Sequence, residues 1–170
     1  MRILTPDIYL EHINRVTPEL LKRYGIKGLI LDVDNTLTHH NSQEISAEVL
    51  AWIDLMRQNG IKLMIASNNN APRIEPFSKK IGIDAIPNSA KPLPIGYQKA
   101  KKCFGFAANE IAVIGDQVYT DILGANACGM LSIMVRYFEA EDSSFFRLKR
   151  KLEKPVLAHY RKIGQKGEKR

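Results

Sequence analysis

Four aspartates follow apolar runs of this 170-residue sequence at spacings that suit metal chemistry. Asp32 and Asp34 come directly after one apolar run, and Asp116 comes after another, with Asp121 five positions further on. Side chains at i and i+2 of an extended chain point to the same side, so Asp32 and Asp34 can face one site. Crowded carboxylates repel one another, and a hard divalent cation with oxygen ligands relieves that repulsion. We therefore expect these residues to hold Mg²⁺.

A hydroxyl and an ammonium group follow two further apolar runs. Ser67 comes after residues 62–66, and Lys91 comes a few positions after residues 83–86. A lysine binds phosphate as a point charge, and a serine hydroxyl beside backbone N–H groups adds donors. Together with Mg²⁺, Lys91 would neutralise the charge that develops on a phosphoryl group in transfer. An Asx-type turn would explain residues 32–36 alone, but not the whole ordered set.

Apolar runs and amphipathic segments alternate along the chain, which indicates the elements that must position these groups. We expect strands over residues 27–32, 62–66, 83–86, 110–115 and 130–135, and helices over residues 46–59, 71–81, 94–104 and 119–128. This alternation favours βαβ units and a parallel sheet with helices on both faces. The expected fold class is α/β, a doubly wound, Rossmann-like domain of about five strands. Ligands bind beyond the carboxyl ends of such strands, where the polar groups stand.

The two ends of the chain differ from this pattern. In residues 1–25, apolar side chains recur at roughly helical spacing, and we expect a helical lead-in to a domain over residues 1–140. Residues 147–170 contain ten Lys or Arg and two Asp or Glu, a net of +8 against +7 for the whole chain. The basic character therefore belongs to the end of the chain, and we expect residues 141–170 to form a separate basic tail.

The tail has the pattern of a basic amphipathic helix. Its apolar side chains recur at steps of three or four: Phe145, Leu148, Leu152, Val156, Tyr160 and Ile163. Helices of this kind lie on anionic membranes, and we expect such a contact through residues 145–163. Pro155 would kink the helix or split it in two. Packing of the apolar stripe on the domain, formation of a homo-oligomer and a merely solvated tail are the alternatives.

The sequence predicts neither a membrane span nor a secretion signal. The longest uncharged stretch, residues 122–135, is 14 residues long and contains Gly, Asn and Ser, so it is too short and polar to cross a bilayer. Asp7, Glu11 and Arg15 interrupt the N-terminal apolar pattern, unlike a signal peptide. We expect a cytoplasmic protein with peripheral contact to the inner face of the membrane.

The polar groups together resemble the four motifs of the haloacid dehalogenase-like (HAD) phosphatase superfamily. The first motif, DxDxT, is residues 32–36; the second is Ser67, the third is Lys91, and the fourth, GDxxxxD, is residues 115–121. The segments GIKGLILDVDNTLT, ASNNN and GDQVYTDILGAN also resemble subfamily IIIA phosphatases of the YqeG type. That group is related to the phosphatidylglycerophosphate phosphatases of mitochondria and plastids.

The resemblance implies a reaction in two steps. Asp32 would be the nucleophile that forms an aspartyl-phosphate, and Asp34 would protonate the leaving group and then activate water. Mg²⁺ would be held by Asp32, by Asp116 and by the backbone carbonyl of Asp34. Asp121 would support the metal.

The resemblance also assigns the groups that hold the substrate. Ser67 and Lys91 would bind the phosphoryl group, with Lys91 also steadying the nucleophile, and Thr36 would orient the catalytic loop at the substrate. Asn68 follows Ser67 directly, and we expect it to contact the substrate. Neighbouring polar side chains have no assigned role: His39, His40, Asn69, Asn70 and Arg73.

The spacing of the motifs leaves no room for a cap domain, which family members often carry after the first motif or the third strand. Only 30 residues separate Thr36 from Ser67, and four separate Ile86 from Lys91. We expect an open site in a Mg²⁺-dependent phosphatase of phosphatidylglycerophosphate or a similar lipid phosphate. The alternatives are a phosphatase of a soluble metabolite and a nucleic-acid- or ribosome-associated binding protein. The tail has no RNA-binding motif, so nucleic acid is the less favoured partner.

Overall fold

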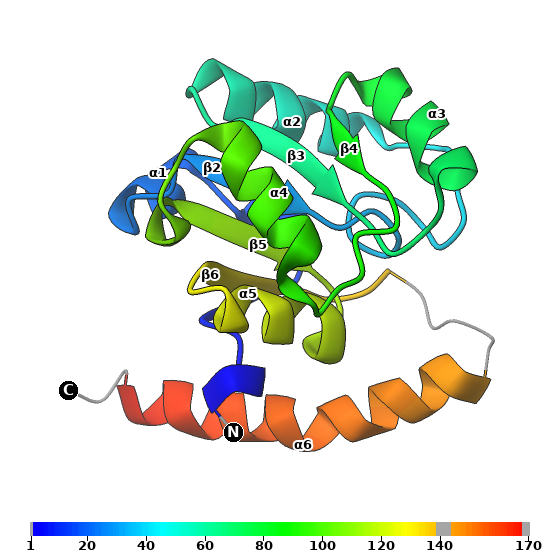
Figure 1. Cartoon of the computed structure of the whole chain (residues 1–170). Helices are drawn as coiled ribbons and strands as arrows, with labels where there is room; N and C mark the ends of the chain where they lie inside the picture. The colour runs from blue at the N-terminus through cyan, green and yellow to red at the C-terminus, as the bar shows by residue number, and fades with distance from the viewer. Residues whose placement is uncertain (1, 139–143, 168–170) are drawn as a thin grey trace.

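The computed structural model describes residues 2–138 and 144–167, which form a parallel sheet with helices on both of its faces (Figure 1). The sheet has six strands in the order β1-β6-β5-β2-β3-β4, and every neighbouring pair is parallel. Their bounds are β1 Ile8–Leu10, β2 Gly28–Leu31, β3 Lys62–Ala66, β4 Ala85–Ile86, β5 Ile111–Gly115 and β6 Leu131–Val135. The predicted α/β class and doubly wound parallel sheet are confirmed.

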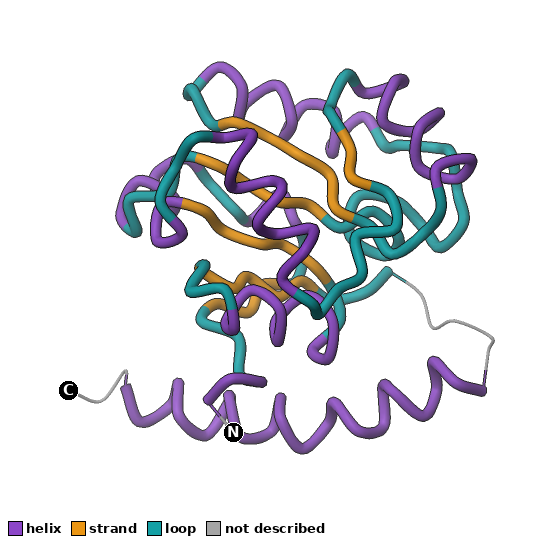
Figure 2. Tube along the Cα trace, in the orientation of Figure 1, coloured by secondary structure: helices purple, strands orange, loops and turns teal. Residues whose placement is uncertain are grey.

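Alternation of side chains along the central strands builds two apolar layers. In β2, Leu29 and Leu31 pack in the layer formed with α2 (Ala47–Gln58) and α3 (Ala71–Ile81). Ile30 points the other way, into the layer formed with α4 (Pro94–Phe104) and α5 (Leu123–Ala127). Figure 2 shows the strands between these purple helices. Burial of both faces explains why β2 and β5 are almost continuously apolar.

Local signals set the ends of the helices. Ser46 caps α2 by accepting a hydrogen bond from the Val49 N–H, and Asn70 caps α3 in the same way through the Arg73 N–H. Helix α3 ends at Gly82, in the left-handed conformation with φ of +63°. The predicted bounds of α3 and α4 are confirmed.

The predicted helical lead-in over residues 1–25 is replaced by shorter elements and a sixth strand. They are the 3₁₀ turns η1 (Arg2–Leu4) and η2 (Ile13–Arg15), the strand β1, and the short helix α1 (Pro18–Arg23). The Asp7 carboxylate accepts hydrogen bonds from the N–H and the hydroxyl of Ser132, at 2.9 and 3.0 Å. This contact aligns β1 with β6, and long-range pairing therefore prevails over the local helical spacing.

The predicted helix over residues 119–128 consists of two parts. A π-helical turn, η4 (Val118–Ile122), comes first and leads into α5. Such turns occur mostly as short insertions in α-helices and are frequent at functional sites, and η4 carries Asp121.

The basic tail is one helix, α6 (Ser144–Gly167), which continues through Pro155 without a break and runs along the β6 side of the domain (Figure 1). Val156 is buried against the domain, and the ring of Tyr160 makes an edge contact with Tyr9. Leu148 and Leu152 of the same predicted apolar stripe are 57% and 53% exposed. The stripe is thus divided between the domain and the surface.

The buried side of α6 is also bonded to the domain. Glu153 is 2% exposed, and its carboxylate accepts a hydrogen bond of 2.9 Å from the N–H of Val118, the first residue of η4. The Tyr160 hydroxyl accepts from the Tyr9 N–H at 3.1 Å. In the described residues, no helix has the length and apolar character needed to cross a membrane.

Candidate active site

Three strands of the sheet bring the polar groups of the predicted motifs together. Leu31 of β2 is paired with Ile65 of β3 and with Ile114 of β5, so these three strands end at nearly the same level. Asp32, Ser67 and Asp116 follow those ends and meet at the carboxyl edge of the sheet. Ligands of doubly wound sheets bind at this edge.

Lys91 is the central cation of the site. Its ammonium group donates to Asp32 Oδ1 at 2.6 Å and to Asp121 Oδ1 at 2.7 Å, and its side chain is 3% exposed. Burial by itself would lower the pKa of Lys91, but the charges of Asp121 and Asp32 outweigh it and raise that pKa. Lys91 is therefore a permanent positive charge beside Asp32, where a phosphoryl group would need one.

Asn68 holds the backbone of Lys91 in place. Its Oδ1 accepts from the Lys91 N–H at 2.7 Å, and its Nδ2 donates to the Lys91 carbonyl at 2.9 Å. Oδ1 also accepts from the Ser89 hydroxyl at 3.2 Å. Asn68 lines the cavity, and most of its hydrogen-bonding capacity serves the loop that carries Lys91, while its contact with the substrate stays a prediction.

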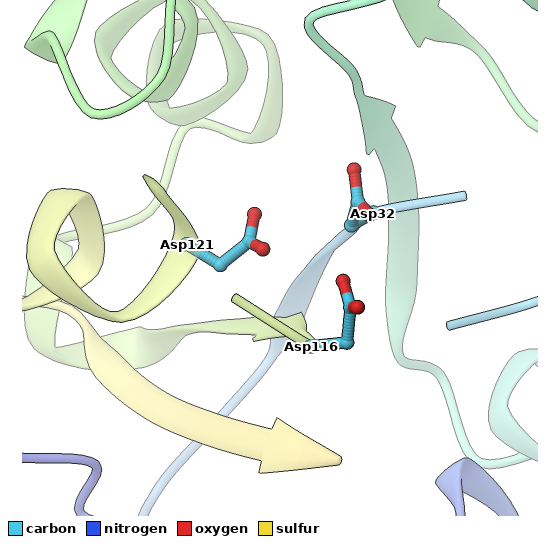
Figure 3. Close-up of side chains that lie close together, drawn as sticks. All are labelled: Asp32, Asp116 and Asp121. Carbon is cyan, nitrogen blue, oxygen red and sulfur yellow. The ribbon is translucent and has the colours of Figure 1, made fainter. Parts of the chain in front are cut away.

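Three buried carboxylates lie close together in the site (Figure 3). Asp32, Asp116 and Asp121 each offer an oxygen, and these oxygens lie within 4.8 Å of one another. The pKa of Asp32 is raised to about 6, because burial and the charge of Asp121 raise it by more than Lys91 lowers it. Only oxygen atoms are offered, and this donor set fits a hard cation such as Mg²⁺.

Gly115 makes room for Asp121. The Asp121 carboxylate folds back over β5 and accepts a hydrogen bond from the Gln117 N–H at 3.2 Å. A Cβ atom at position 115 would lie 2.6 Å from the Cβ of Asp121. Real Cβ atoms do not approach so closely, so a glycine is needed here for Asp121 to reach Lys91 and the other carboxylates.

Asp34 lies at the same edge but turns to a different set of partners. Its Oδ1 accepts from the Asn41 N–H at 2.8 Å and from Arg73 Nη2 at 2.7 Å, and its Oδ2 accepts from Asn69 Nδ2. Its carboxylate is not part of the three-carboxylate group. Metal binding through the backbone carbonyl of Asp34, as the resemblance implies, is compatible with this arrangement.

The remaining predicted residues differ in their exposure to the site. Ser67 lines the cavity, and its Oγ accepts from the Asn69 N–H at 3.2 Å. Thr36 is buried, and its Oγ1 has no hydrogen-bond partner within the described part of the chain. Thr36 does not line the cavity, and its predicted role at the substrate stays a prediction.

The mouth of the site is a small cavity of about 150 Å³. Lining residues come from all four motifs, including Gln117 and Thr120 of the fourth, and from His40, Asn68 and Asn69. His39, the neighbour of His40, instead packs its ring against Phe138 at 5.2 Å between centroids. A larger hollow of about 450 Å³ lies between α1 and the end of α2 and contains none of the predicted site residues.

Sequence reasoning placed Asn69 and Arg73 near the site without a role. Both contact Asp34 from 35 and 39 positions away along the chain, respectively. The available signal was their position: Asn69 follows Ser67 by two residues, and Arg73 lies in the first turn of α3. Neither fact indicates which carboxylate each side chain would reach.

Comparison with known proteins leads to the same class. The chain is 33% identical over 163 residues to the probable phosphatase YqeG of Bacillus subtilis, covering 96% of this chain and 95% of that one. It is 26% identical over 175 residues to phosphatidylglycerophosphate phosphatase 1 of Arabidopsis thaliana, covering 97% of this chain and 50% of the longer relative.

A solved structure with the same fold is the cobalt-bound deoxy-D-mannose-octulosonate 8-phosphate phosphatase of Haemophilus influenzae. The TM-score is 0.55 at 18% identity, over 82% of this chain and 91% of that one. This similarity concerns the fold alone.

A parallel sheet that gathers a DxDxT loop, a serine, a lysine and a GDxxxxD turn at one edge defines a phosphatase of the HAD type. Residues 1–137 match the family described as mitochondrial PGP phosphatase, and the chain belongs to that family. It is a phosphoric monoester hydrolase related to the YqeG and phosphatidylglycerophosphate phosphatases.

Proposed function

We propose that the protein hydrolyses phosphatidylglycerophosphate or a similar lipid phosphate in a Mg²⁺-dependent reaction with an aspartyl-phosphate intermediate. The observation that carries this proposal is the position of Lys91, whose Nζ lies 2.6 Å from Asp32 and 2.7 Å from Asp121. The Lys91 ammonium group thus contacts both the expected nucleophile, Asp32, and a carboxylate of the expected metal site, Asp121.

In the first step, Asp32 attacks the phosphorus atom of the bound monoester. A bond forms between a carboxylate oxygen of Asp32 and phosphorus, and the bond from phosphorus to the leaving oxygen breaks. Asp34 gives its proton to that oxygen, so the product leaves as an alcohol. Lys91 and the Ser67 hydroxyl bind the phosphoryl oxygens and stabilise their charge.

In the second step, Asp34 acts as a base. Its carboxylate takes a proton from a water molecule, whose oxygen attacks the phosphorus atom of the intermediate. The bond between phosphorus and Asp32 breaks, which releases inorganic phosphate and restores the Asp32 carboxylate. Asp34 is then protonated again, ready for the next substrate.

Mg²⁺ would be held by the Asp32 and Asp116 carboxylates and the Asp34 carbonyl, with Asp121 in support. When bound, it supplies Lewis-acid stabilisation of the phosphoryl charge. The donor set supports this assignment because three carboxylates share the site and Lys91 contributes one positive charge to them. Burial is the main cause of the raised pKa of Asp32 and the charge of Asp121 adds to it, so a bound divalent cation would favour the ionised carboxylate.

A lipid substrate is supported by relationship and by the surface of α6. The matched family and the Arabidopsis relative both carry PGP phosphatase names. On α6, exposed Leu148 and Leu152 lie among exposed basic side chains, including Arg147, Lys151 and Lys154. An apolar edge beside cationic groups suits an anionic lipid surface. We therefore also propose that the docked α6 contacts the inner, cytoplasmic face of a membrane.

The test is phosphate release from phosphatidylglycerophosphate in mixed micelles, with and without Mg²⁺, for wild type and Asp32→Asn. Release that requires both Mg²⁺ and Asp32 supports the whole proposal. If only aryl phosphates are cleaved, the mechanism stands and the lipid substrate is wrong.

The membrane contact needs its own measurement. Sedimentation with anionic vesicles should recover wild type, while a Leu148→Ser, Leu152→Ser double variant should remain largely in the supernatant. Equal recovery of both proteins, or recovery with neutral vesicles to the same extent, would refute the contact.

A further inference from the structure

Asp34, the expected general acid and base, accepts hydrogen bonds from donors in two separate segments. The Asn41 N–H belongs to the loop after the first motif, while Asn69 and Arg73 come from the end of β3 and the start of α3. Because the donors reach both carboxylate oxygens, they fix the rotation of the carboxylate plane. General acid catalysis requires this kind of fixed geometry at the leaving oxygen.

The Arg73 guanidinium group, from the second of those segments, contacts the first segment and Asp34 itself. The same Nη2 that bonds Asp34 also donates to the Ser42 carbonyl at 2.8 Å. In return, Gln43 Nε2 donates to the Arg73 carbonyl at 2.9 Å. The loop that supplies the Asn41 N–H is thus tied to α3 through both the side chain and the backbone carbonyl of Arg73, and Lys80 Nζ adds a bond to the Gln43 carbonyl at 3.0 Å.

The surroundings of Arg73 hold its guanidinium group in this position. The side chain is 13% exposed, and its guanidinium carbon lies 5.8 Å from the centre of the Phe77 ring. Nε and Nη1 are buried and make no hydrogen bond within the described residues. Burying two unbonded nitrogens is costly, so the contacts of Nη2 with Asp34 and Ser42 are the interactions that compensate.

We propose that Arg73 is a positioning residue that aims Asp34 at the leaving-group oxygen by clamping the loop over residues 39–45 to α3. This rests on the proposed role of Asp34 as the acid. A clamp of this kind gives a capless site the fixed acid geometry that an open edge does not otherwise supply.

The test compares two substrates of nearly the same shape that need the acid to different degrees. Phenyl phosphate releases a weakly acidic phenol and needs a proton from Asp34, whereas 4-nitrophenyl phosphate releases a stable anion. Arg73→Met keeps the aliphatic stem over Phe77 but removes the donor. Arg73→Lys restores one charged donor. Lys79→Met is the matched control because it removes one positive charge from an exposed side chain of the same helix.

We expect Arg73→Met to lower kcat/KM for phenyl phosphate about tenfold to hundredfold through kcat, with less than about a threefold loss for 4-nitrophenyl phosphate. Arg73→Lys should recover part of the loss, and Lys79→Met should resemble wild type with both substrates. Equal losses on the two substrates would show a merely structural role and overturn the proposal, as would no loss on either.

Crystal structures of wild type and Arg73→Met test the positioning claim without reference to turnover. Asp34 should keep one orientation in wild type and change or lose it in the variant. An unchanged Asp34 in the variant overturns the proposal for Arg73, whereas absence of turnover in wild type counts against the proposed function instead.

Discussion

Substitution of Lys91 by methionine gives a sharp test of the electrostatics of the site. Lys91 lies between two buried carboxylates, with Nζ at 2.6 Å from Asp32 and 2.7 Å from Asp121. Methionine has a similar length but no charge, so it leaves the two carboxylates facing each other. Removing one partner of a buried ion pair costs about 3–5 kcal/mol of folding free energy. We expect a loss of that size for the metal-free protein near neutral pH.

The loss should depend on pH in a defined direction. Burial already raises the pKa of Asp32 to about 6 while Lys91 lowers it, so removing Lys91 raises this pKa further. An acid with a raised folded-state pKa favours folding while it is protonated and loses that contribution as the pH rises through the pKa. The deficit of Lys91→Met should therefore be small near about pH 5 and grow by up to about 1.4 kcal/mol per pH unit toward about pH 8.

Denaturant unfolding in EDTA at several pH values measures this deficit. Lys27→Met is the control because Lys27 pairs with Glu110 at the surface, with side chains 58% and 28% exposed, and its removal should change stability little at any of these pH values. A deficit for Lys91→Met that is the same at low and high pH would refute the reasoning. Saturating Mg²⁺ should reduce the deficit, because a bound cation replaces part of the lost charge.

Three further results are expected. Gly115→Ala should weaken Mg²⁺ binding about 10–100-fold in calorimetry, since the added Cβ displaces the Asp121 carboxylate that supports the metal. Gly28→Ala, at the opposite end of the sheet, is the control and should leave the Mg²⁺ affinity unchanged. Equal Mg²⁺ affinities of the two variants would contradict this role of Gly115. Mg²⁺ affinity of wild type should fall about tenfold per pH unit below about pH 6, where Asp32 must lose a proton before it can bind the metal, and a flat profile would argue against Asp32 as a ligand. Glu153→Ala should speed amide hydrogen exchange at Val118 about tenfold or more, because the buried N–H loses its acceptor; unchanged exchange would mean that α6 does not hold η4.

Much of the site could be predicted because its parts follow strands directly. Asp32, Ser67 and Asp116 stand one position after apolar runs, and parallel strands bring their carboxyl ends to one edge whatever the loops do. The bounds of α3 were equally accessible, because Asn70 caps its start and Gly82 ends it. Both features depend on residues that are close together in the sequence, so they can be predicted from it.

Features that depend on distant contacts could not be predicted in the same way. Strand β1 is only three residues long and pairs with β6 through Asp7 and Ser132, which are 125 positions apart. Asn68 looked like a substrate contact, but the loop over residues 88–91 takes up much of its amide. The α6 stripe is likewise only partly buried, because the hydrogen bond between Glu153 and the first residue of η4 sets which side of α6 faces the domain. Periodicity alone does not indicate which neighbour a side chain will meet.

The most direct test of the central claim is to trap the phosphoryl group on the enzyme. Wild type and Asp32→Asn are mixed with substrate and Mg²⁺, quenched in acid during turnover, digested, and examined by peptide mass spectrometry. We expect a single phosphorylated peptide whose modification is at Asp32 in wild type and absent in the variant. A phosphoryl group on another residue, or turnover that persists in Asp32→Asn, would contradict this expectation.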